Sequence, residues 1–304
     1  SLVKILQNDK KSFVIGEDIH DPYGGAFKVT KNLSSSFKKQ TFSTPISESA
    51  ITGIASGMAL KGHKVILEIM FGDFLTLIVD QVHNGISKSL ELQKNRKFGS
   101  LTIRTPMGGY RGYGCTHSQS IETLFMNTPN IEIYSPNAFI DPGKLLKKIV
   151  NENKLSLFIE HKLSYSKECE IKSYDGNKLI IDHKEDYSKI RIFDEDPKFT
   201  IITYGYISEL GLRAIHNFFI ENEINGELIV LSKIKNFSLE FLDNLDTNLI
   251  LTLEEGVSLN GWGKLISSTI YEKKFGKLEK PIINIGAKSS IIPSSIEKEK
   301  NILP

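Results

Sequence analysis

The chain has 304 residues, of which 38 are basic and 36 acidic, and its formal net charge is only +2. This balance excludes the general positive footprint that is typical of proteins that bind DNA or RNA. A hydrophobic content of 40% is that of a globular protein with a substantial core, and the length predicts two domains.

The first half of the chain alternates apolar strands with helices. Residues 12–18 predict a strand, and the helix that follows has apolar side chains at helical spacing, namely Ile51, Ile54, Ala55, Met58 and Ala59. A strand at 63–69 and a helix over 74–92 come next, before short strands at 100–106, 131–137 and 155–161. Near-continuous apolar strands alternating with helices predict a mostly parallel sheet with helices on both faces.

The second half repeats this pattern after a polar interval. Residues 169–197 are polar and charged, which is typical of a connection between domains. Strands are expected at 198–206, 226–234, 248–256 and 281–288, with helices at 208–222 and 261–274. We therefore predict an α/β protein with two domains, at 1–165 and 191–304, joined by a connecting segment at 166–190.

Two further features bear on location and metal binding. Cys115 and Cys169 are too few to form a disulfide framework, which favours a reducing compartment. No stretch approaches the roughly 20 apolar residues of a membrane span. The seven histidines show no ligand pairing that is typical of structural zinc. We expect a soluble cytoplasmic protein without a metal site of its own.

One loop after a predicted strand attracts attention, with the sequence RTPMGGYRGYGCTHSQS over residues 104–120. Ligand sites of parallel sheets lie beyond the carboxyl ends of the strands, so its position makes it a candidate. Gly112 and Gly114 begin a dinucleotide-binding fingerprint, but its third glycine is replaced by His117, and residues 260–266 lack the complete phosphate loop. A Cys115–His117 nucleophile pair is disfavoured because residues two apart on a loop seldom meet. A helix-capping role remains open for His117.

Glu48 in the segment TPISE is a second candidate. It lies in the first turn of the predicted helix, where the macrodipole favours negative charge, so a structural role is open. A capping box does not account for it, because Thr44 as the cap places Ser47 at the third helical position, and Ser47 as the cap places Ala50 there.

These segments, in their order, resemble the β subunit of thiamine-diphosphate-dependent 2-oxo acid dehydrogenases. The resemblance rests on the segments TPISE, EIMFGDF, DQVHN, RTPMGGYRGYGCTHSQS and TPNIEIYSPN. It continues through FTIITYG, NLILTLEEG with the following NGWG, and GAKSSIIP, which match the carboxyl-terminal domain shared with transketolases. The resemblance therefore covers nearly the whole chain and implies a transketolase-like fold.

The resemblance implies a cofactor role for three residues. In this family the first domain binds the aminopyrimidine of thiamine diphosphate, and the glutamate that matches Glu48 hydrogen-bonds the pyrimidine nitrogen and helps to activate the cofactor. Phe74 matches an aromatic residue that packs on the pyrimidine, and Met70 is expected one helical turn earlier in the same wall. Core packing is the alternative for both apolar side chains.

The resemblance also implies roles for the glycine-rich loop. His117 matches a histidine thought to assist acyl transfer to a lipoyl group, for which a side chain that titrates near neutral pH is suited. Ser118 and Gln119 are expected to orient it or to begin the next helix. Tyr110, Arg111 and Tyr113 stand where common members have small residues. We expect Arg111 and Tyr113 to contact substrate, with the guanidinium binding a carboxylate or phosphate, and Arg104 to be structural.

The sequence lacks one part of the expected site. The Gly-Asp-Gly motif with a distant asparagine, which holds magnesium and diphosphate in this family, does not occur here, and residues 72–74 are not that motif. By resemblance, a separate α subunit supplies it in an α2β2 assembly, with a β dimer as the alternative, and a lipoyl acyltransferase core is a further partner. The beginning looks shortened, which is consistent with a trimmed chain or one half of an α/β fusion.

Two other functions stay open. One is a thiamine-dependent acyloin or ketose synthase, which would share Glu48 and Phe74 but use an aldehyde as acceptor. The other is a non-catalytic assembly subunit, against which the presence of both Glu48 and His117 argues.

Overall fold

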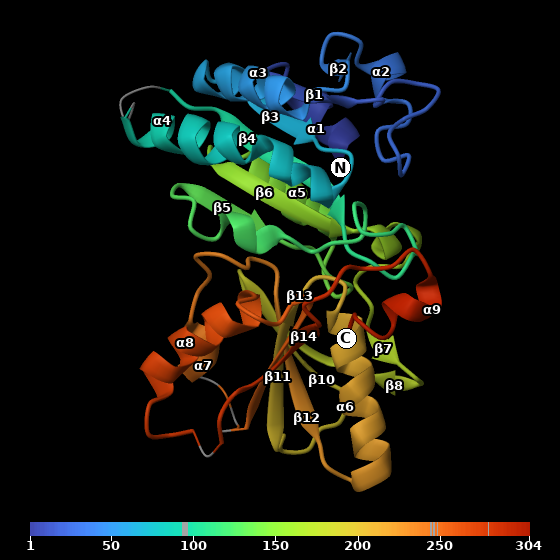
Figure 1. Ribbon diagram of the computed structural model, residues 1–304, viewed down its shortest axis with the longest axis vertical. Coiled ribbons are helices and arrows are strands. Elements are labelled where there is room, and N and C mark those ends of the chain that lie inside the picture. Colours follow the sequence, from blue (N-terminus) through green and yellow to red (C-terminus); the bar gives the residue numbers. More distant parts are fainter. Residues whose placement is uncertain (93–96, 244, 246, 248, 279) are drawn as a thin grey trace. The chain divides into compact units, whose positions relative to one another are not determined.

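The computed structural model describes residues 1–92, 97–243, 245, 247, 249–278 and 280–304, and the chain divides into two compact units (Figure 1). Unit 1 comprises residues 1–107, 121–134 and 142–165, and unit 2 comprises residues 108–120, 135–141 and 166–304. The glycine-rich loop therefore groups with unit 2. Within the described part of the chain, no helix is both long and apolar enough to cross a bilayer.

Unit 1 contains a six-stranded sheet in which all neighbouring strands are parallel. Its order is β2-β1-β3-β4-β6-β5. The strands are β1 (Ser12–Glu17), β2 (Thr41–Thr44), β3 (Lys64–Glu68), β4 (Ser100–Met107), β5 (Ile131–Tyr134) and β6 (Leu155–His161). Every residue of β4 is buried, as expected for a central strand with both faces covered. The predicted parallel sheet is confirmed, and β2 adds an edge strand that was not predicted.

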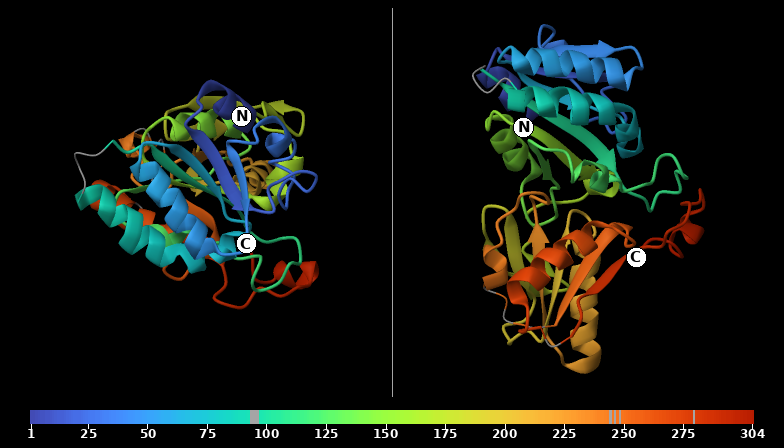
Figure 2. Two further views of the ribbon diagram at one scale, coloured as in Figure 1. Left: turned by 90° about the horizontal axis from the view of Figure 1, so that it is seen from above. Right: turned by 60° about the vertical axis from the view of Figure 1, so that its left-hand side comes forward.

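Helices cover both faces of this sheet (Figure 2). On one face, α1 (Leu2–Asn8), α2 (Leu33–Ser36) and α5 (Pro142–Val150) form an apolar cluster with side chains of β1, β3 and β6. On the other face, α3 (Glu48–Leu60) packs with the segment over 72–92. Successive residues of a strand point to opposite faces of the sheet. A strand with helices on both faces therefore needs apolar residues at nearly every position.

Helix α3 buries a narrower face than its sequence predicts. Ile51, Ala55 and Ala59 are buried as expected, but Ile54 is 57% exposed, which corrects its assignment to the core face. The buried face also carries Glu48 and small polar side chains. The spacing of the apolar residues alone did not predict that polar residues belong to this buried face.

The helix expected over residues 74–92 is three consecutive helical segments. These are a 3₁₀ helix, η1 (Gly72–Ile78), a π-helical segment, η2 (Gln81–Ile86), and α4 (Ser87–Leu92). Ile78, Val82 and Ile86 are buried, as their four-residue apolar repeat predicts, but Leu77, which was expected on the same face, is 51% exposed. That repeat does not distinguish a regular α-helix from tighter or wider turns. The remaining helix of unit 1 is η3 (Glu122–Phe125), and η4 (Lys162–Ser166) follows β6.

Unit 2 contains a mixed six-stranded sheet in the order β14-β13-β11-β12-β10-β9. β11 (Phe199–Tyr204), β12 (Gly226–Leu231), β13 (Ile250–Val257) and β14 (Ile283–Ala287) are parallel and match the four predicted strands. Asn248, the first residue of one of those predictions, lies outside the described residues.

The segment expected as a connection at 166–190 is instead mostly part of this unit. It contains a hairpin of β7 (Ser173–Tyr174) and β8 (Asn177–Lys178), then β9 (Ile180–His183) and most of β10 (Tyr187–Arg191). β10 pairs antiparallel with β12 and with β9. Polar side chains are common on the edge strands of a sheet, which explains why the sequence of this segment resembles a linker.

Helices lie on both faces of the second sheet (Figure 1). α6 (Ser208–Asn222) packs with one apolar cluster, which includes Leu253, and α8 (Trp262–Lys274) lies on the face to which Thr252 points. Two short helices, α7 (Glu240–Asp243) and α9 (Ile296–Glu299), complete the described part of the unit. The predicted helices at 208–222 and 261–274 are confirmed.

Two isoleucines of α3 provide a test of the packing. Ile51 is 3% exposed and Ile54 is 57% exposed. We expect Ile51→Ala to lower the free energy of unfolding by about 2–5 kcal/mol, because it leaves a cavity in the core. Ile54→Ala is the matched control and should change it by less than about 0.5 kcal/mol. Urea denaturation of the isolated chain measures both, and equal losses would contradict the assigned faces.

Candidate active site

Charged side chains gather at the carboxyl ends of the central strands of unit 1. Arg104 on β4 lies between Glu68 at the end of β3 and Glu160 on β6. Its Nη1 is 2.6 Å from Glu68 Oε2, its Nε forms an ion pair with Glu160, and its Nη2 donates to the Tyr165 hydroxyl at 2.8 Å. The cluster of Glu68, Arg104, Glu160 and Tyr165 thus joins three adjacent strands.

Burial governs the protonation of this cluster. Burial acts to lower the pKa of Arg104, but the charges of Glu160 and Glu68 outweigh it, and the pKa is raised. Burial also raises the pKa of Glu160, against the opposing charge of Arg104, and it raises the pKa of the Tyr165 hydroxyl well above its ordinary value. Arg104 therefore stays charged, and its structural role is confirmed.

The loop after β1 covers this cluster. Gly25 has a φ of +77°, and a Cβ at this position would lie 2.9 Å from Glu68 Oε1. Only glycine combines this backbone conformation with so close an approach to the carboxylate. The loop is held further by the Thr30 hydroxyl, which donates to the Ile19 carbonyl at 3.0 Å.

Glu48 is the first residue of α3 and lies at the carboxyl edge of the same sheet. Ser47 is the N-cap, and its amide donates to Glu17 Oε1 at the end of β1, over 2.9 Å. Burial raises the pKa of Glu17, and the nearby charge of Glu48 adds to this effect. Glu48 is only 8% exposed, and its carboxyl group has no hydrogen-bond or ion-pair partner among the described residues. A buried acid of this kind fits an external hydrogen-bonding partner.

Aromatic side chains form a wall in unit 1 near the start of η1. Phe74 lies edge-on to Phe71, with ring centroids 5.8 Å apart, and Phe71 lies edge-on to Phe27 at 6.0 Å. Phe27 stacks on Tyr165 at 5.0 Å. The wall thus connects Phe74 with the charged cluster, and its flat rings suit a planar ligand.

Met70 is placed differently from the prediction. It lies in the loop between β3 and η1 and is partly buried, whereas Phe71 is the N-cap of η1. It is therefore not one helical turn before Phe74, because the helix begins only at Gly72.

The other candidate residues lie on the glycine-rich loop of unit 2. The Arg111 guanidinium lies over the ring of Tyr113, 5.1 Å from its centroid, and Tyr113 is 41% exposed. His117 is partly buried, and its Nδ1 lies 2.9 Å from Thr116 Oγ1. The capping role left open for His117 is wrong, because η3 begins at Glu122 with Ile121 as its N-cap.

The residues beside His117 take different positions. Ser118 is buried, and its hydroxyl has no hydrogen-bond partner among the described residues. Gln119 donates from Nε2 to the Cys115 carbonyl at 2.9 Å, which closes the tip of the loop. Neither residue begins the following helix, so this part of the expectation is also wrong.

The structure thus brings the predicted residues into two groups. Glu48 and Phe74 lie in unit 1, and Arg111, Tyr113 and His117 lie in one loop of unit 2. The sequence analysis missed several neighbours of these groups, which are Glu17, Phe27, Phe71, Glu160 and Tyr165. Only the position of Glu17 at the end of a predicted strand could have indicated its role.

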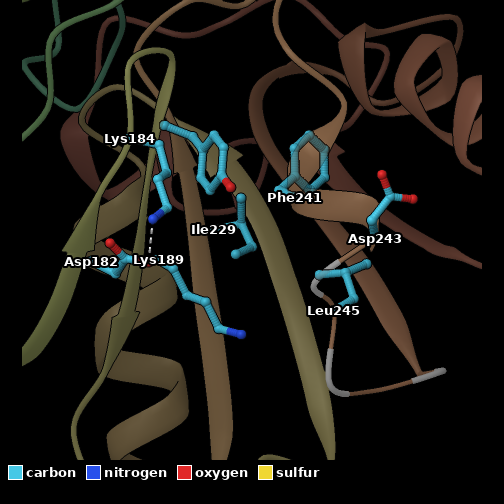
Figure 3. Close-up of a pocket in the computed structure, with 8 residues that line it drawn as sticks. Asp182, Lys184, Lys189, Ile229, Phe241, Asp243 and Leu245 are labelled. Carbon is cyan, nitrogen blue, oxygen red and sulfur yellow. Dashed lines mark ion pairs between the residues drawn. The ribbon is translucent and has the colours of Figure 1, made fainter.

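A separate cavity of about 440 Å³ lies in unit 2 (Figure 3). Its lining includes Lys184 and Lys189, which pair with Asp182 and Glu227 at 3.1 and 2.9 Å. Because these charges are already paired and none of the candidate residues lines the cavity, we do not place the reaction there. Among the described residues, no cluster of three or more His, Cys, Asp or Glu side chains could hold a metal ion.

Two protein families match the chain. Residues 1–167 match the family described as transketolase, pyrimidine binding domain, and residues 188–304 match transketolase, C-terminal domain.

Individual proteins are similar over nearly the full chain. The 2-oxoisovalerate dehydrogenase subunit beta, mitochondrial, of Dictyostelium discoideum is 32% identical, over 96% of this chain and 78% of that protein. The pyruvate dehydrogenase E1 component subunit beta of Rickettsia conorii is 28% identical, over 97% and 89% respectively. A solved structure titled split gene transketolase, inactive beta4 tetramer, has a TM-score of 0.69 at 17% identity, covers 98% of this chain and 90% of that one, and shows a shared fold.

The buried carboxyl of Glu17 predicts a specific pH dependence. Because its pKa is raised above 4.5 in the folded chain, its contribution to stability is complete below about pH 4.5 and is lost as the pH rises through the folded value. We expect Glu17→Gln, which keeps an acceptor for the Ser47 amide, to gain thermal stability relative to the native chain between pH 5 and 8. Glu221→Gln, on an exposed residue of α6, is the control. Unfolding midpoints that stay parallel across this range would contradict the expectation.

Proposed function

Because this chain belongs to the family of β subunits of thiamine-diphosphate-dependent 2-oxo acid dehydrogenases, we propose that Glu48 and His117 are its catalytic residues. The chain is the β subunit of the decarboxylating component, an oxidoreductase that passes an acyl group from a 2-oxo acid to a lipoyl carrier. Relatives act on pyruvate and on 2-oxoisovalerate, so the family resemblance supports the reaction class and not one particular acid.

We assign a separate role to each of the two domains of the chain. Residues 1–165 form the pyrimidine-binding domain, and residues 191–304 form the transketolase C-terminal-like domain. The matched ranges 1–167 and 188–304 support this division.

The buried state of Glu48 is the observation that carries the proposal. The residue is 8% exposed, and no hydrogen bond or ion pair joins its carboxyl group to another described residue, so the carboxyl group can accept the aminopyrimidine nitrogen as its partner. Glu17 fixes the start of α3 through the Ser47 amide and thereby orients Glu48. Thiamine diphosphate supplies the electron sink for decarboxylation, and Glu48 holds and moves the proton that activates it.

The aromatic wall gives the cofactor ring a surface. Phe74 is partly buried and packs edge-on against Phe71, which fixes the orientation of its ring. We assign Phe74 to packing on the pyrimidine and Met70 to the loop beside it.

The glycine-rich loop serves the acyl acceptor and the substrate. His117 donates or accepts a proton during transfer to the lipoyl group, and the Thr116 hydroxyl restricts the orientation of its ring. Arg111 binds the carboxylate of the 2-oxo acid, and stacking on Tyr113 limits the guanidinium to fewer orientations.

A partner subunit completes the site. Magnesium and the diphosphate would be held by an α subunit that carries the Gly-Asp-Gly motif, in an α2β2 assembly. Three exposed apolar side chains support the proposal that the α subunit covers part of the surface of unit 1. They are Ile46, Ile54 and Leu77. A lipoyl acyltransferase core is the expected further partner. The cytoplasmic location stays a prediction, since some relatives are described as mitochondrial.

Two alternatives are separated by acceptor assays. An acyloin or ketose synthase would transfer its product to an aldehyde and leave lipoyl domains unmodified. A non-catalytic assembly subunit would tolerate loss of Glu48. The synthase is considered because Arg111 and Tyr113 are bulky at positions where common dehydrogenase subunits have small residues.

Glu48→Gln tests the main proposal. In the enzyme reconstituted with its α subunit, we expect 2-oxo acid decarboxylation to fall by about 10²–10⁴-fold, because glutamine cannot exchange the proton. Glu152→Gln, which changes a carboxylate just after α5 in the same unit, is the control and should keep full activity. Unchanged turnover in Glu48→Gln would support the non-catalytic alternative instead.

Arg111→Ala tests substrate binding. We expect the KM for the 2-oxo acid to rise about tenfold or more while kcat stays within about twofold, because a charged hydrogen bond to the substrate is lost. Steady-state kinetics of the reconstituted enzyme measures both constants. Arg191→Ala, on β10, is the matched control, and an unchanged KM for Arg111→Ala would rule out this role.

A further inference from the structure

The loop that carries His117 is fastened to a distant part of the chain within unit 2. We call residues 108–120 the histidine loop and residues 288–304 the C-terminal strap. In Figures 1 and 2 the green loop lies beside the red segment that includes α9. Four hydrogen bonds from the loop fix this arrangement, two to Glu255 of β13 and one each to Glu299 and Pro304 of the strap.

Glu255 on β13 holds both ends of the histidine loop. Its Oε1 accepts from the Gly109 amide at 2.6 Å and lies 3.4 Å from the Ser120 hydroxyl, which donates to it. Because Glu255 is 6% exposed and belongs to a central strand, the base of the loop is attached to a rigid element.

Glu299 at the end of α9 holds the middle of the loop. Its Oε2 accepts from the Gly112 amide at 3.0 Å, although the residue is completely buried. Burying a carboxylate is costly unless it is well hydrogen-bonded, and Glu299 Oε1 has no partner among the described residues. A four-residue helix does not need such a group for its own stability, so the contact with the loop is its evident use.

Loop and strap meet at the level of the backbone. Gly112 has a φ of +66°, and a Cβ at this position would lie 2.8 Å from the Ser294 carbonyl oxygen. Glycine is therefore required here both by the backbone conformation and by the lack of space.

Tyr110 adds a third attachment. Its hydroxyl donates to the main-chain oxygen of Pro304 at 2.8 Å, and its ring packs with Ala287, Ile292 and Leu303. Its φ of 63° lies in the left-handed region, which is unfavourable for a bulky residue and persists only where the surroundings enforce it. The strap thus imposes the backbone conformation of the loop immediately before Arg111.

We propose that Glu299 is a positioning residue for acyl transfer, which holds the histidine loop through the Gly112 amide so that His117 is presented in one geometry. This inference rests on the proposed function of His117. Among the described residues, no hydrogen bond or ion pair joins Glu299 to His117. Glu299 acts on the backbone five residues earlier, between the anchor at Gly109 and the tip at His117. Small displacements of an acid–base group lower the rate of its step strongly, so at saturating 2-oxo acid, where binding by Arg111 of the same loop does not limit the rate, the effect should be confined to the reaction that His117 serves.

The test separates two half-reactions of the enzyme reconstituted with its α subunit. Decarboxylation is measured with an artificial electron acceptor, and acyl transfer is measured on an isolated lipoyl domain. We expect Glu299→Ala to lower acyl transfer between about 10- and 100-fold and to lower the kcat of decarboxylation, measured at saturating 2-oxo acid because Arg111 lies in the same loop, by less than about twofold. Glu299→Gln keeps an oxygen that accepts from the Gly112 amide and should restore acyl transfer to near the native rate. Glu297→Ala changes an exposed carboxylate of the same helix and should have no effect.

The outcomes distinguish this inference from the proposed function. If His117→Ala loses acyl transfer but Glu299→Ala does not, the positioning role is overturned and the role of His117 stands. If His117→Ala keeps acyl transfer, the proposed function of the histidine itself has failed. An equal fall of both half-reactions in Glu299→Ala would identify a purely structural residue and also overturn the inference.

A second, milder variant tests the same inference if Glu299→Ala does not fold. Tyr110→Phe removes only the hydroxyl that reaches Pro304, and we expect a smaller loss of the same selective kind. Hydrogen exchange should show faster exchange in residues 108–120 of this variant and unchanged exchange in α6. Native exchange in the loop together with native acyl transfer would count against positioning by the strap.

Discussion

A single buried guanidinium constrains the arrangement of unit 1. Arg104 belongs to the central strand β4 and binds carboxylates from both neighbouring strands, Glu68 of β3 and Glu160 of β6. A buried ion pair contributes little net stability, but leaving one of its charges without a partner costs about 3–5 kcal/mol. The three strand ends are therefore held in one relative register. The segments that leave β3 and β6 carry Phe71, Phe74 and Tyr165 of the aromatic wall, and β4 leads into the histidine loop, so all of these depend on that register. The loop after β1 packs against the same cluster, where Gly25 approaches Glu68.

In unit 2, two consecutive glutamates of β13 accept hydrogen bonds on opposite faces of the sheet. Glu254 accepts from the amides of Trp262 and Gly263 at 2.8 Å each and thereby satisfies the start of α8. Glu255 points the other way, as successive strand residues do, and binds the base of the histidine loop. Two adjacent residues of β13 thus bind α8 on one face of the sheet and the histidine loop on the other side.

Local patterns predicted the parallel strands and the helices α6 and α8, because their apolar repeats are regular and both layers of each sheet are filled. They failed for β9, an exposed edge strand whose sequence resembles a polar linker, and for β10, whose polar and charged residues interrupt the apolar pattern although the strand is paired on both sides. They also failed for Ile54, which lies on the outer face of α3. The family resemblance indicated Glu48, Phe74 and His117, which lie at the start of α3, within η1 and in the loop after β4. The partners that position them were not predictable from local sequence, because Arg104 and Glu68 are 36 residues apart and Gly112 and Glu299 are 187 apart.

The long separation between the histidine loop and the strap has a consequence for the order of folding. Residues 108–120 are synthesised long before residues 299–304, and contacts between segments so far apart close late because the entropy of a large loop must be overcome first. A nascent chain can complete the parallel sheet of unit 1 while Tyr110 and Gly112 still lack their hydrogen-bond partners. The loop therefore takes its final conformation only after residues 299–304 have been synthesised and have reached it, later than the sheet of unit 1.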